Sequence, residues 1–115
     1  MASFKEAWLI TAHNEGGYAN VKNDRGGETY MGIARNFFPK WAGWAIVDKH
    51  KPLKHNAFIK DEKLHSLVES FYEENFWNPI NANKIADQDL ANQAFDMAVN
   101  AGVGAAKNLL KQSGI

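Results

Sequence analysis

Glycines are concentrated between residues 16 and 33, and this stretch limits what the chain can fold into more than any other feature. It holds five of the nine glycines of the 115-residue chain, together with several Asn and Asp residues, which favour turns. Short apolar pieces lie between the turn signals, over 18–21 and 29–33. The pattern predicts a small antiparallel hairpin. Because a hairpin of this size is not stable alone, it must rest on helices.

Apolar residues recur at helical spacing on both sides of this stretch. Ser3 and Glu6 have the spacing of a capping box, and the helix that begins there is expected to end near residues 14–15, before Gly16 and Gly17. Further helices are predicted over 40–49, from Asp61 to Trp77, over 87–101 and from 103 onward. The chain is therefore expected to be mainly α, with one small Gly-rich β-hairpin after the first helix.

Composition excludes several classes of function. Lys plus Arg and Asp plus Glu are both 13, so the net charge is zero, which argues against a nucleic-acid-binding protein. No apolar run approaches the roughly 20 residues of a membrane span. The chain has no Cys, its four His lack the spacing of a helical metal pair, and Gly102-Val103-Gly104 lacks the context of a dinucleotide-binding motif. We expect that the protein binds no metal and no cofactor and that it is not an integral membrane protein.

Two carboxylates suggest chemistry. Glu15 lies where the first helix should end, and the partial negative charge of a helix C-terminus raises a carboxyl pKa, as a general acid requires. Asp24 follows nine positions later, and a hairpin folded beside the helix end would bring both carboxylates to one cleft, the arrangement of glycoside hydrolysis. An exposed Glu15 and a turn-forming Asp24 remain the alternatives. Thr29 can hydrogen-bond a water or a sugar, or serve only as a strand residue.

Four blocks of sequence follow one another in the order His13-Asn14-Glu15-Gly16-Gly17-Tyr18, then 23–33, which contains Asp24-Arg25-Gly26-Gly27-Glu28-Thr29, then 72–80 and 95–102. Together they resemble glycoside hydrolase family 108, and the resemblance extends from about residue 4 to residue 113. It implies a lysozyme-like, α-rich fold and an N-acetylmuramidase, which cuts the β-1,4 bond between N-acetylmuramic acid and N-acetylglucosamine in peptidoglycan. Members include phage or prophage endolysins and muramidases that serve secretion, some called secretion activator proteins.

The resemblance also assigns roles. The catalytic Glu of the family's E-G-G-Y motif corresponds to Glu15. Phage-type lysozymes place an acidic or Cys residue and then a Thr after their catalytic Glu. Here the spacing to Asp24 matches that pattern, whereas Thr29 comes one residue early. By this analogy, Asp24 and Thr29 position the water.

Aromatic side chains near these residues are expected to line the sugar-binding cleft, because aromatic faces stack on sugar rings. The candidates are Tyr18, Tyr30 and Trp44, and for each a place in the hydrophobic core is the competing interpretation. Two rival functions remain open. A lytic transglycosylase also uses a Glu but releases an anhydro sugar, and a non-catalytic wall-binding or secretion accessory protein would bind glycan without cutting it.

We expect residues 1–115 to form a single lysozyme-like catalytic domain whose partner is the peptidoglycan glycan strand. The peptidoglycan-binding-like region that usually follows in the family is expected to be missing or truncated. Because the N-terminus lacks the pattern of a Sec signal peptide, we expect synthesis in the cytoplasm. Action in the periplasm or on the cell wall would then follow holin- or secretion-dependent release.

The C-terminal helix generates a prediction about assembly. Val103, Ala106, Leu109 and Leu110 form an apolar face, and an uncovered apolar face favours association. We therefore expect a homodimer through this helix, which would appear as a dimer in sedimentation at tens of micromolar protein. A monomer alone under these conditions would contradict the prediction.

Overall fold

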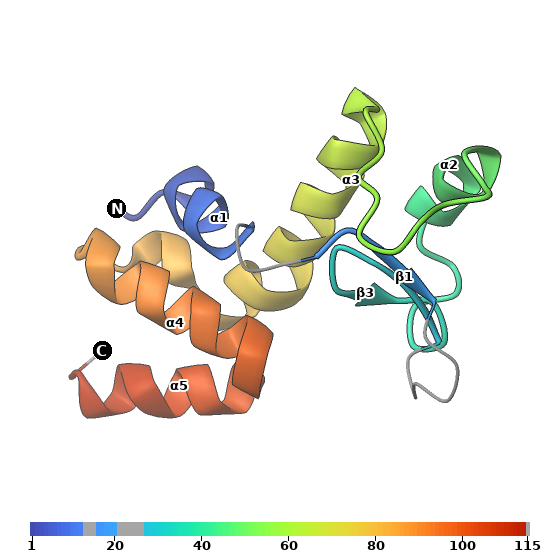
Figure 1. Cartoon of the computed structure of the whole chain (residues 1–115). Coiled ribbons are helices and arrows are strands. Elements are labelled where there is room, and N and C mark those ends of the chain that lie inside the picture. The colour runs from blue at the N-terminus through green and yellow to red at the C-terminus, as the bar shows by residue number, and fades with distance from the viewer. Residues whose placement is uncertain (13–15, 21–26, 115) are drawn as a thin grey trace. The chain divides into compact units, whose positions relative to one another are not determined.

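The computed structural model describes residues 1–12, 16–20 and 27–114 (Figure 1). The chain divides into two compact units, one formed by Met1–Ala12 with Glu69–Ile115 and the other by His13–Val68. Helices dominate and a small antiparallel sheet follows the first helix, so the predicted mainly α, lysozyme-like fold class is confirmed. Among the described residues, no helix is both long and apolar enough to span a bilayer.

The first unit is built from helices. It contains α1 (Phe4–Ala12), α4 (Gln88–Ala101) and α5 (Val103–Gln112), and α4 packs against both of the others (Figure 1). Asp87 caps α4 by accepting a hydrogen bond from the backbone N–H of Asp89, and Gly102 ends it with a positive φ of 100°. Both boundaries agree with the helix predicted over 87–101.

The start of α1 differs from the predicted capping box. The Ser3 hydroxyl accepts a hydrogen bond from the Glu6 N–H at 3.5 Å, as expected. The Ser3 N–H, however, donates to the side-chain oxygen of Gln88 at 2.6 Å, and the Gln88 amide donates back to the Ser3 carbonyl at 3.0 Å. A residue distant in the sequence therefore takes the place of Glu6 and fixes α1 to α4.

Aromatic rings fill the core of this unit. Phe4 lies edge-on to Trp77 and to Phe95, with ring centroids 5.6 and 5.5 Å apart, and Trp8 lies 5.0 Å from Tyr72. Trp77 and Phe95 are almost fully buried. Such edge-to-face pairs stabilise the core beyond the burial of their area. Trp8 and Trp77 therefore both belong to the core of this unit.

The predicted helix over 61–77 is not α-helical throughout. Asp61 caps α3 (Glu62–Tyr72) by accepting from the Leu64 N–H, and the expected apolar face is buried at Leu64 and Val68. The chain then continues as a π-helical turn, η1 (Glu73–Trp77), and two 3₁₀ turns, η2 (Asn78–Ile80) and η3 (Ala82–Lys84). Pro79 explains part of this change, because it has no N–H to donate within a helix.

The second unit contains α2 (Gly43–Lys49) and the sheet. The expected hairpin is present as β1 (Tyr18–Asn20) and β2 (Glu28–Tyr30), and a short third strand, β3 (Ile33–Ala34), pairs with β2. The piece expected over 29–33 is therefore not one strand. Met31 and Gly32 form a turn within it, both with positive φ, which matches a two-residue hairpin turn of type I′.

The expected apolar face of α5 is partly covered within the first unit. Ala106 and Leu110 are buried, whereas Val103 and Leu109 are half-exposed. Helix α4 packs on α5, so some of the surface assigned to a partner copy is already in contact within the chain. Dimerisation through this helix stays a prediction.

Candidate active site

The described residues include part of the candidate catalytic set. Glu15 and Asp24 lie outside them, so the structure does not test the expected pairing of these carboxylates. Thr29 lies on β2 and is half-buried. Tyr18 and Tyr30 lie on the paired strands β1 and β2, and Trp44 lies on α2.

The strand register sets the direction of the side chains around Thr29. Thr29 pairs with Ala19 on one side and Ala34 on the other. Paired residues share a face, and successive residues alternate between faces. Thr29 therefore shares its face with two small side chains, whereas Glu28 and Tyr30 lie on the opposite face. A water-positioning role for Thr29 stays a prediction.

The three aromatic candidates for sugar binding are buried. The exposed fractions are 7% for Tyr18, 0% for Tyr30 and 2% for Trp44. The Tyr30 hydroxyl accepts from the Ile59 N–H at 3.1 Å, and Trp44 Nε1 donates to the Phe38 carbonyl at 2.9 Å.

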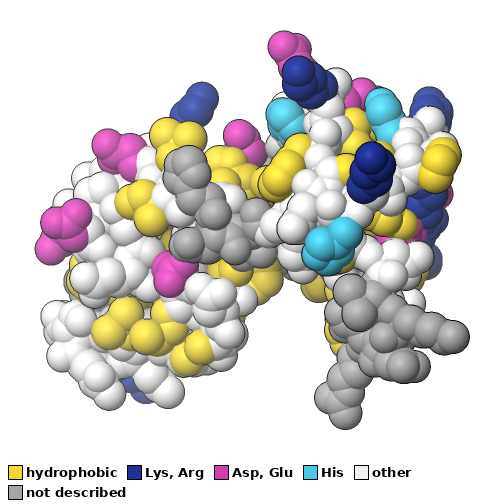
Figure 2. All heavy atoms as spheres, viewed as in Figure 1, with side chains coloured by type: hydrophobic (Ala, Val, Ile, Leu, Met, Phe, Trp, Pro, Cys, Tyr) yellow, Lys and Arg dark blue, Asp and Glu magenta, His cyan; other side chains and the backbone are white. Residues whose placement is uncertain are grey.

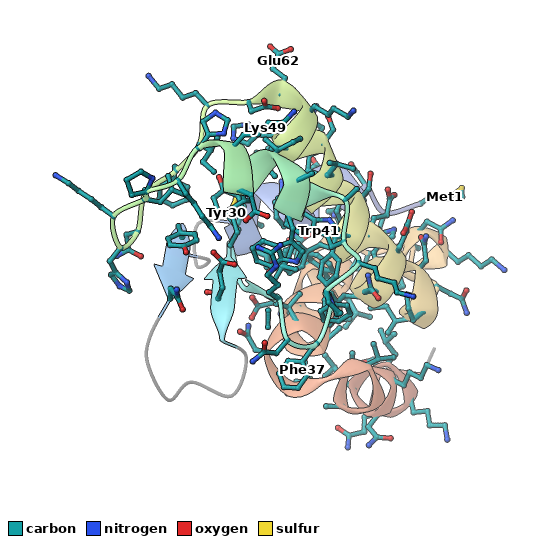
Figure 3. All side chains as sticks on the ribbon, turned by 90° about the vertical axis from the view of Figure 1, so that its right-hand side faces the viewer. Met1, Tyr30, Phe37, Trp41, Lys49 and Glu62 are labelled. Carbon is teal, nitrogen blue, oxygen red and sulfur yellow. The ribbon has the colours of Figure 1, made fainter. Side chains whose placement is uncertain are left out.

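Burial raises the pKa of the Tyr30 hydroxyl, although the bond from Ile59 opposes this shift. Trp41, which is labelled in Figure 3, is a further aromatic residue of this unit. Its ring lies edge-on to that of Trp44, with ring centroids 5.4 Å apart. These rings build the second unit, as the competing core interpretation expected, and their contact with a sugar stays a prediction.

The structure explains why the second glycine of the E-G-G-Y motif, Gly17, has no side chain. A β-carbon at Gly17 would lie 2.4 Å from the Ala57 carbonyl oxygen and 2.7 Å from that of Asn56. The close approach lets Tyr18 pair with this segment, since its N–H donates to Ala57 at 2.9 Å and its carbonyl accepts from the Asn56 N–H at 2.7 Å. Gly17 therefore allows residues 56–57 to close the outer edge of β1.

Among the described residues, the Glu28 carboxylate on β2 binds three side chains. In the sequence, Glu28 appeared only as one residue of the family motif, and no role was predicted for it. Arg35 Nη1 donates to Glu28 Oε1 at 2.8 Å, and the Tyr18 hydroxyl donates to Oε2 at 2.5 Å. The Lys51 ammonium forms an ion pair with the same Oε2. Asp48 completes the network, because it accepts a bidentate pair from Arg35 at 2.7 and 2.9 Å and pairs with Lys51 at 2.9 Å. We call Glu28, Arg35, Asp48 and Lys51 the charge tetrad.

The tetrad holds its carboxylates in the charged form. Burial by itself raises the pKa of Glu28, but hydrogen bonds from Lys51, Tyr18 and Arg35 outweigh it, so the pKa lies below the ordinary 4.5. Hydrogen bonds from Arg35 and Lys51 hold the pKa of Asp48 well below its usual range. Both oxygens of Glu28 are engaged and its side chain is 11% exposed. This carboxylate is therefore a structural anion and is unsuited to proton transfer in a reaction.

Metal ligands do not gather in the described part of the chain. No group of three or more His, Asp or Glu side chains there could hold an ion. The histidine side chains visible in Figure 2 lie apart from one another on the surface.

Comparison with known proteins decides the family. The family model described as glycosyl hydrolase 108 matches residues 9–102. The chain belongs to glycosyl hydrolase family 108. The description of this family is that of a glycosidase family.

A solved structure is similar to this family 108 chain, that of SagA from Brucella abortus, with 25% sequence identity and a TM-score of 0.58. The similarity covers 95% of this chain and 57% of SagA, so the chain spans little more than half of that neighbour. No curated protein shows significant sequence similarity to the chain.

Gly17 generates a prediction on stability. Gly17→Ala should lower the free energy of unfolding by about 1–3 kcal/mol, because the added methyl group meets backbone oxygens that cannot move independently. Gly104→Ala is the matched control, since nothing lies within 4 Å of a β-carbon there, and it should leave stability unchanged or raise it by about 0.5 kcal/mol. Urea denaturation measures both, and equal effects would contradict the assignment.

The tetrad generates a prediction on pH. A carboxyl whose pKa is lowered by folding stabilises the protein above its unfolded-state pKa, and this contribution is lost as the pH falls through the folded-state pKa. The urea midpoint should therefore fall as the pH drops from about 5 to about 3, and Asp48→Asn should weaken this dependence.

Glu74→Gln is the control for this measurement, because Glu74 is exposed and has no ion pair among residues 1–12, 16–20 and 27–114. It should keep the wild-type slope of urea midpoint against pH. Identical slopes for Asp48→Asn and wild type would overturn the prediction.

Proposed function

We propose that the chain is a peptidoglycan hydrolase that cleaves the β-1,4 bond between N-acetylmuramic acid and N-acetylglucosamine, with Glu15 as the general acid. The observation that carries the proposal is the family 108 match over residues 9–102, which includes the E-G-G-Y motif and the segment from Asp24 to Thr29. A glycosidase needs a proton donor for the leaving oxygen, and Glu15 is the motif's only ionisable residue with a carboxyl group.

In the proposed reaction, Glu15 donates its proton to the glycosidic oxygen as the bond from that oxygen to the anomeric carbon breaks. Asp24 holds the attacking water or stabilises the positive charge that develops on the sugar ring. Thr29 assists by orienting the water. Inversion is expected if the two carboxyl groups lie about 6.5–9.5 Å apart, and retention if they lie about 5–5.5 Å apart. The phage-type lysozyme spacing favours inversion.

The local structure supports this use of the segment. Gly17 brings β1 against residues 56–57, and the β1–β2 ladder sets the end of the connection that carries Asp24. The ladder also directs Thr29 to a face on which its cross-strand neighbours are the small residues Ala19 and Ala34.

The wider setting belongs to the same proposal. The substrate partner is the peptidoglycan glycan strand, reached in the periplasm or at the cell wall after release through a holin or a secretion route. Service as an endolysin of a phage or prophage, or as a secretion activator, fits this setting.

The test uses purified peptidoglycan incubated with wild type and with Glu15→Gln, followed by mass analysis of the released fragments. Wild type should release fragments with reducing N-acetylmuramic acid ends, and Glu15→Gln should release them more slowly by a factor of about 10²–10⁴ or more. Unchanged circular dichroism and an unchanged urea midpoint would show that the variant is folded.

The other outcomes point to the rival functions. Anhydro sugar ends would identify a lytic transglycosylase. No release by wild type, with the protein still sedimenting with the wall, would favour a binding or secretion accessory protein. Ordinary activity of a folded Glu15→Gln variant would overturn the assignment of the acid.

A further inference from the structure

The tetrad residue Glu28 lies at the end of the β1–β2 ladder, next to the connection between the two strands. Asn20 pairs with Glu28, and this is the last pair of the β1–β2 ladder. The connection between these two residues carries Asp24, and the residue that follows Glu28 is Thr29. Glu28 therefore directly precedes Thr29, one of the two proposed water-positioning groups, at the end of the β1–β2 ladder.

Glu28 is held at both its backbone and its side chain. Its carbonyl accepts from the Arg35 N–H at 2.8 Å, and Oε1 accepts from Arg35 Nη1 at 2.8 Å. Oε2 is held from the other side by the Tyr18 hydroxyl and Lys51. A residue bound in this way fixes the position and the rotation of its strand, since a side chain anchored on one face determines where the next side chain points.

The partners of Glu28 are held in turn. The Arg35 guanidinium lies over the Trp44 ring at 5.0 Å, and the Lys51 ammonium lies 6.0 Å from the Tyr18 ring centroid. Because Trp44 is nearly fully buried on α2, Arg35 connects β2 to a fixed part of the second unit. Glu28 therefore anchors its strand to a rigid support.

We propose that Glu28 is a positioning residue for the glycosidase reaction: its carboxylate holds β2 so that Thr29 stays in register with the reacting sugar. This inference rests on the proposed function. Glu28 transfers no proton, because both its oxygens are occupied and its pKa is lowered. Its effect on the rate comes through the placement of its neighbours, and small misplacements of reacting groups are costly in rate.

Asp48 provides a matched control within the same network. It binds the same two cations as Glu28, so removing its charge also weakens the tetrad. It lies on α2, however, and no hydrogen bond joins it to β2 among the described residues. If the tetrad only stabilises the second unit, the two carboxylates should be interchangeable in their effect on the rate.

The experiment compares Glu28→Gln and Asp48→Asn on purified peptidoglycan, at a temperature where circular dichroism shows wild type and both variants fully folded. Glu28→Gln should lower kcat by about 10- to 100-fold with KM within about twofold, because the misplaced groups act after binding. Asp48→Asn should keep kcat within about twofold. The pH profile of Glu28→Gln should keep the wild-type limbs, since no titrating catalytic group is removed.

A second variant keeps the proposal falsifiable if Glu28→Gln does not fold. Glu28→Asp retains the charge but shortens the side chain by one methylene, and its kcat should lie between those of wild type and the Gln variant. Equal losses of kcat in Glu28→Gln and Asp48→Asn, or no loss in either, would overturn the proposal. A displaced limb in the pH profile would also overturn it, because Glu28 would then titrate in the reaction.

Hydrogen exchange separates failure of this inference from failure of the proposed function. If wild type releases no fragments, the proposed function fails. The anchoring of β2 by Glu28 is then tested by amide hydrogen exchange in peptides that cover residues 27–34. Glu28→Gln should speed exchange in these peptides and Asp48→Asn should leave it near the wild-type rate. Equal exchange in the two variants would reject Glu28 as the anchor of β2.

Discussion

The second unit depends on how the charge of Glu28 is neutralised. A carboxylate that is 11% exposed is costly unless it is paired, and here Arg35, Lys51 and the Tyr18 hydroxyl supply partners for both oxygens. These partners come from β1, the turn after β3 and the segment after α2. A three-stranded sheet with strands of two or three residues has little stability of its own. Arg35 joins it to α2, because the guanidinium that binds Glu28 also binds Asp48 and lies over Trp44.

Around that network, glycines and aromatic rings decide how closely the backbone segments approach. Gly17 lets residues 56–57 reach β1, and the buried Tyr30 hydroxyl accepts from the Ile59 N–H, so the segment after α2 is held at two points. The residues of the E-G-G-Y motif thus serve two different purposes. Gly17 and Tyr18 are explained by packing and hydrogen bonding, whereas Glu15 lies outside the described residues and is the proposed acid.

Much of the fold could be predicted because the relevant signals are local. Asp61, Asp87 and Gly102 mark helix boundaries through their own backbone or nearest neighbours, and those boundaries were predicted within a few residues. The errors came from interactions distant in the sequence. Gln88 replaced Glu6 at the start of α1, and the turn at Met31 was hidden because Met is an unusual residue for positive φ.

By itself, the sequence determined the class of the chain, the order of its helices and its membership of family 108, since periodicity, capping residues and motif spacing are written in consecutive residues. Only the tertiary structure decided what the polar residues of the second unit do. The spacing of the four tetrad residues in the sequence matches no known motif. Each of them, considered alone, would be interpreted as a charged residue exposed to solvent. Their meeting depends on β2, β3 and α2 folding together, because ion pairs between separate elements arise from three-dimensional proximity.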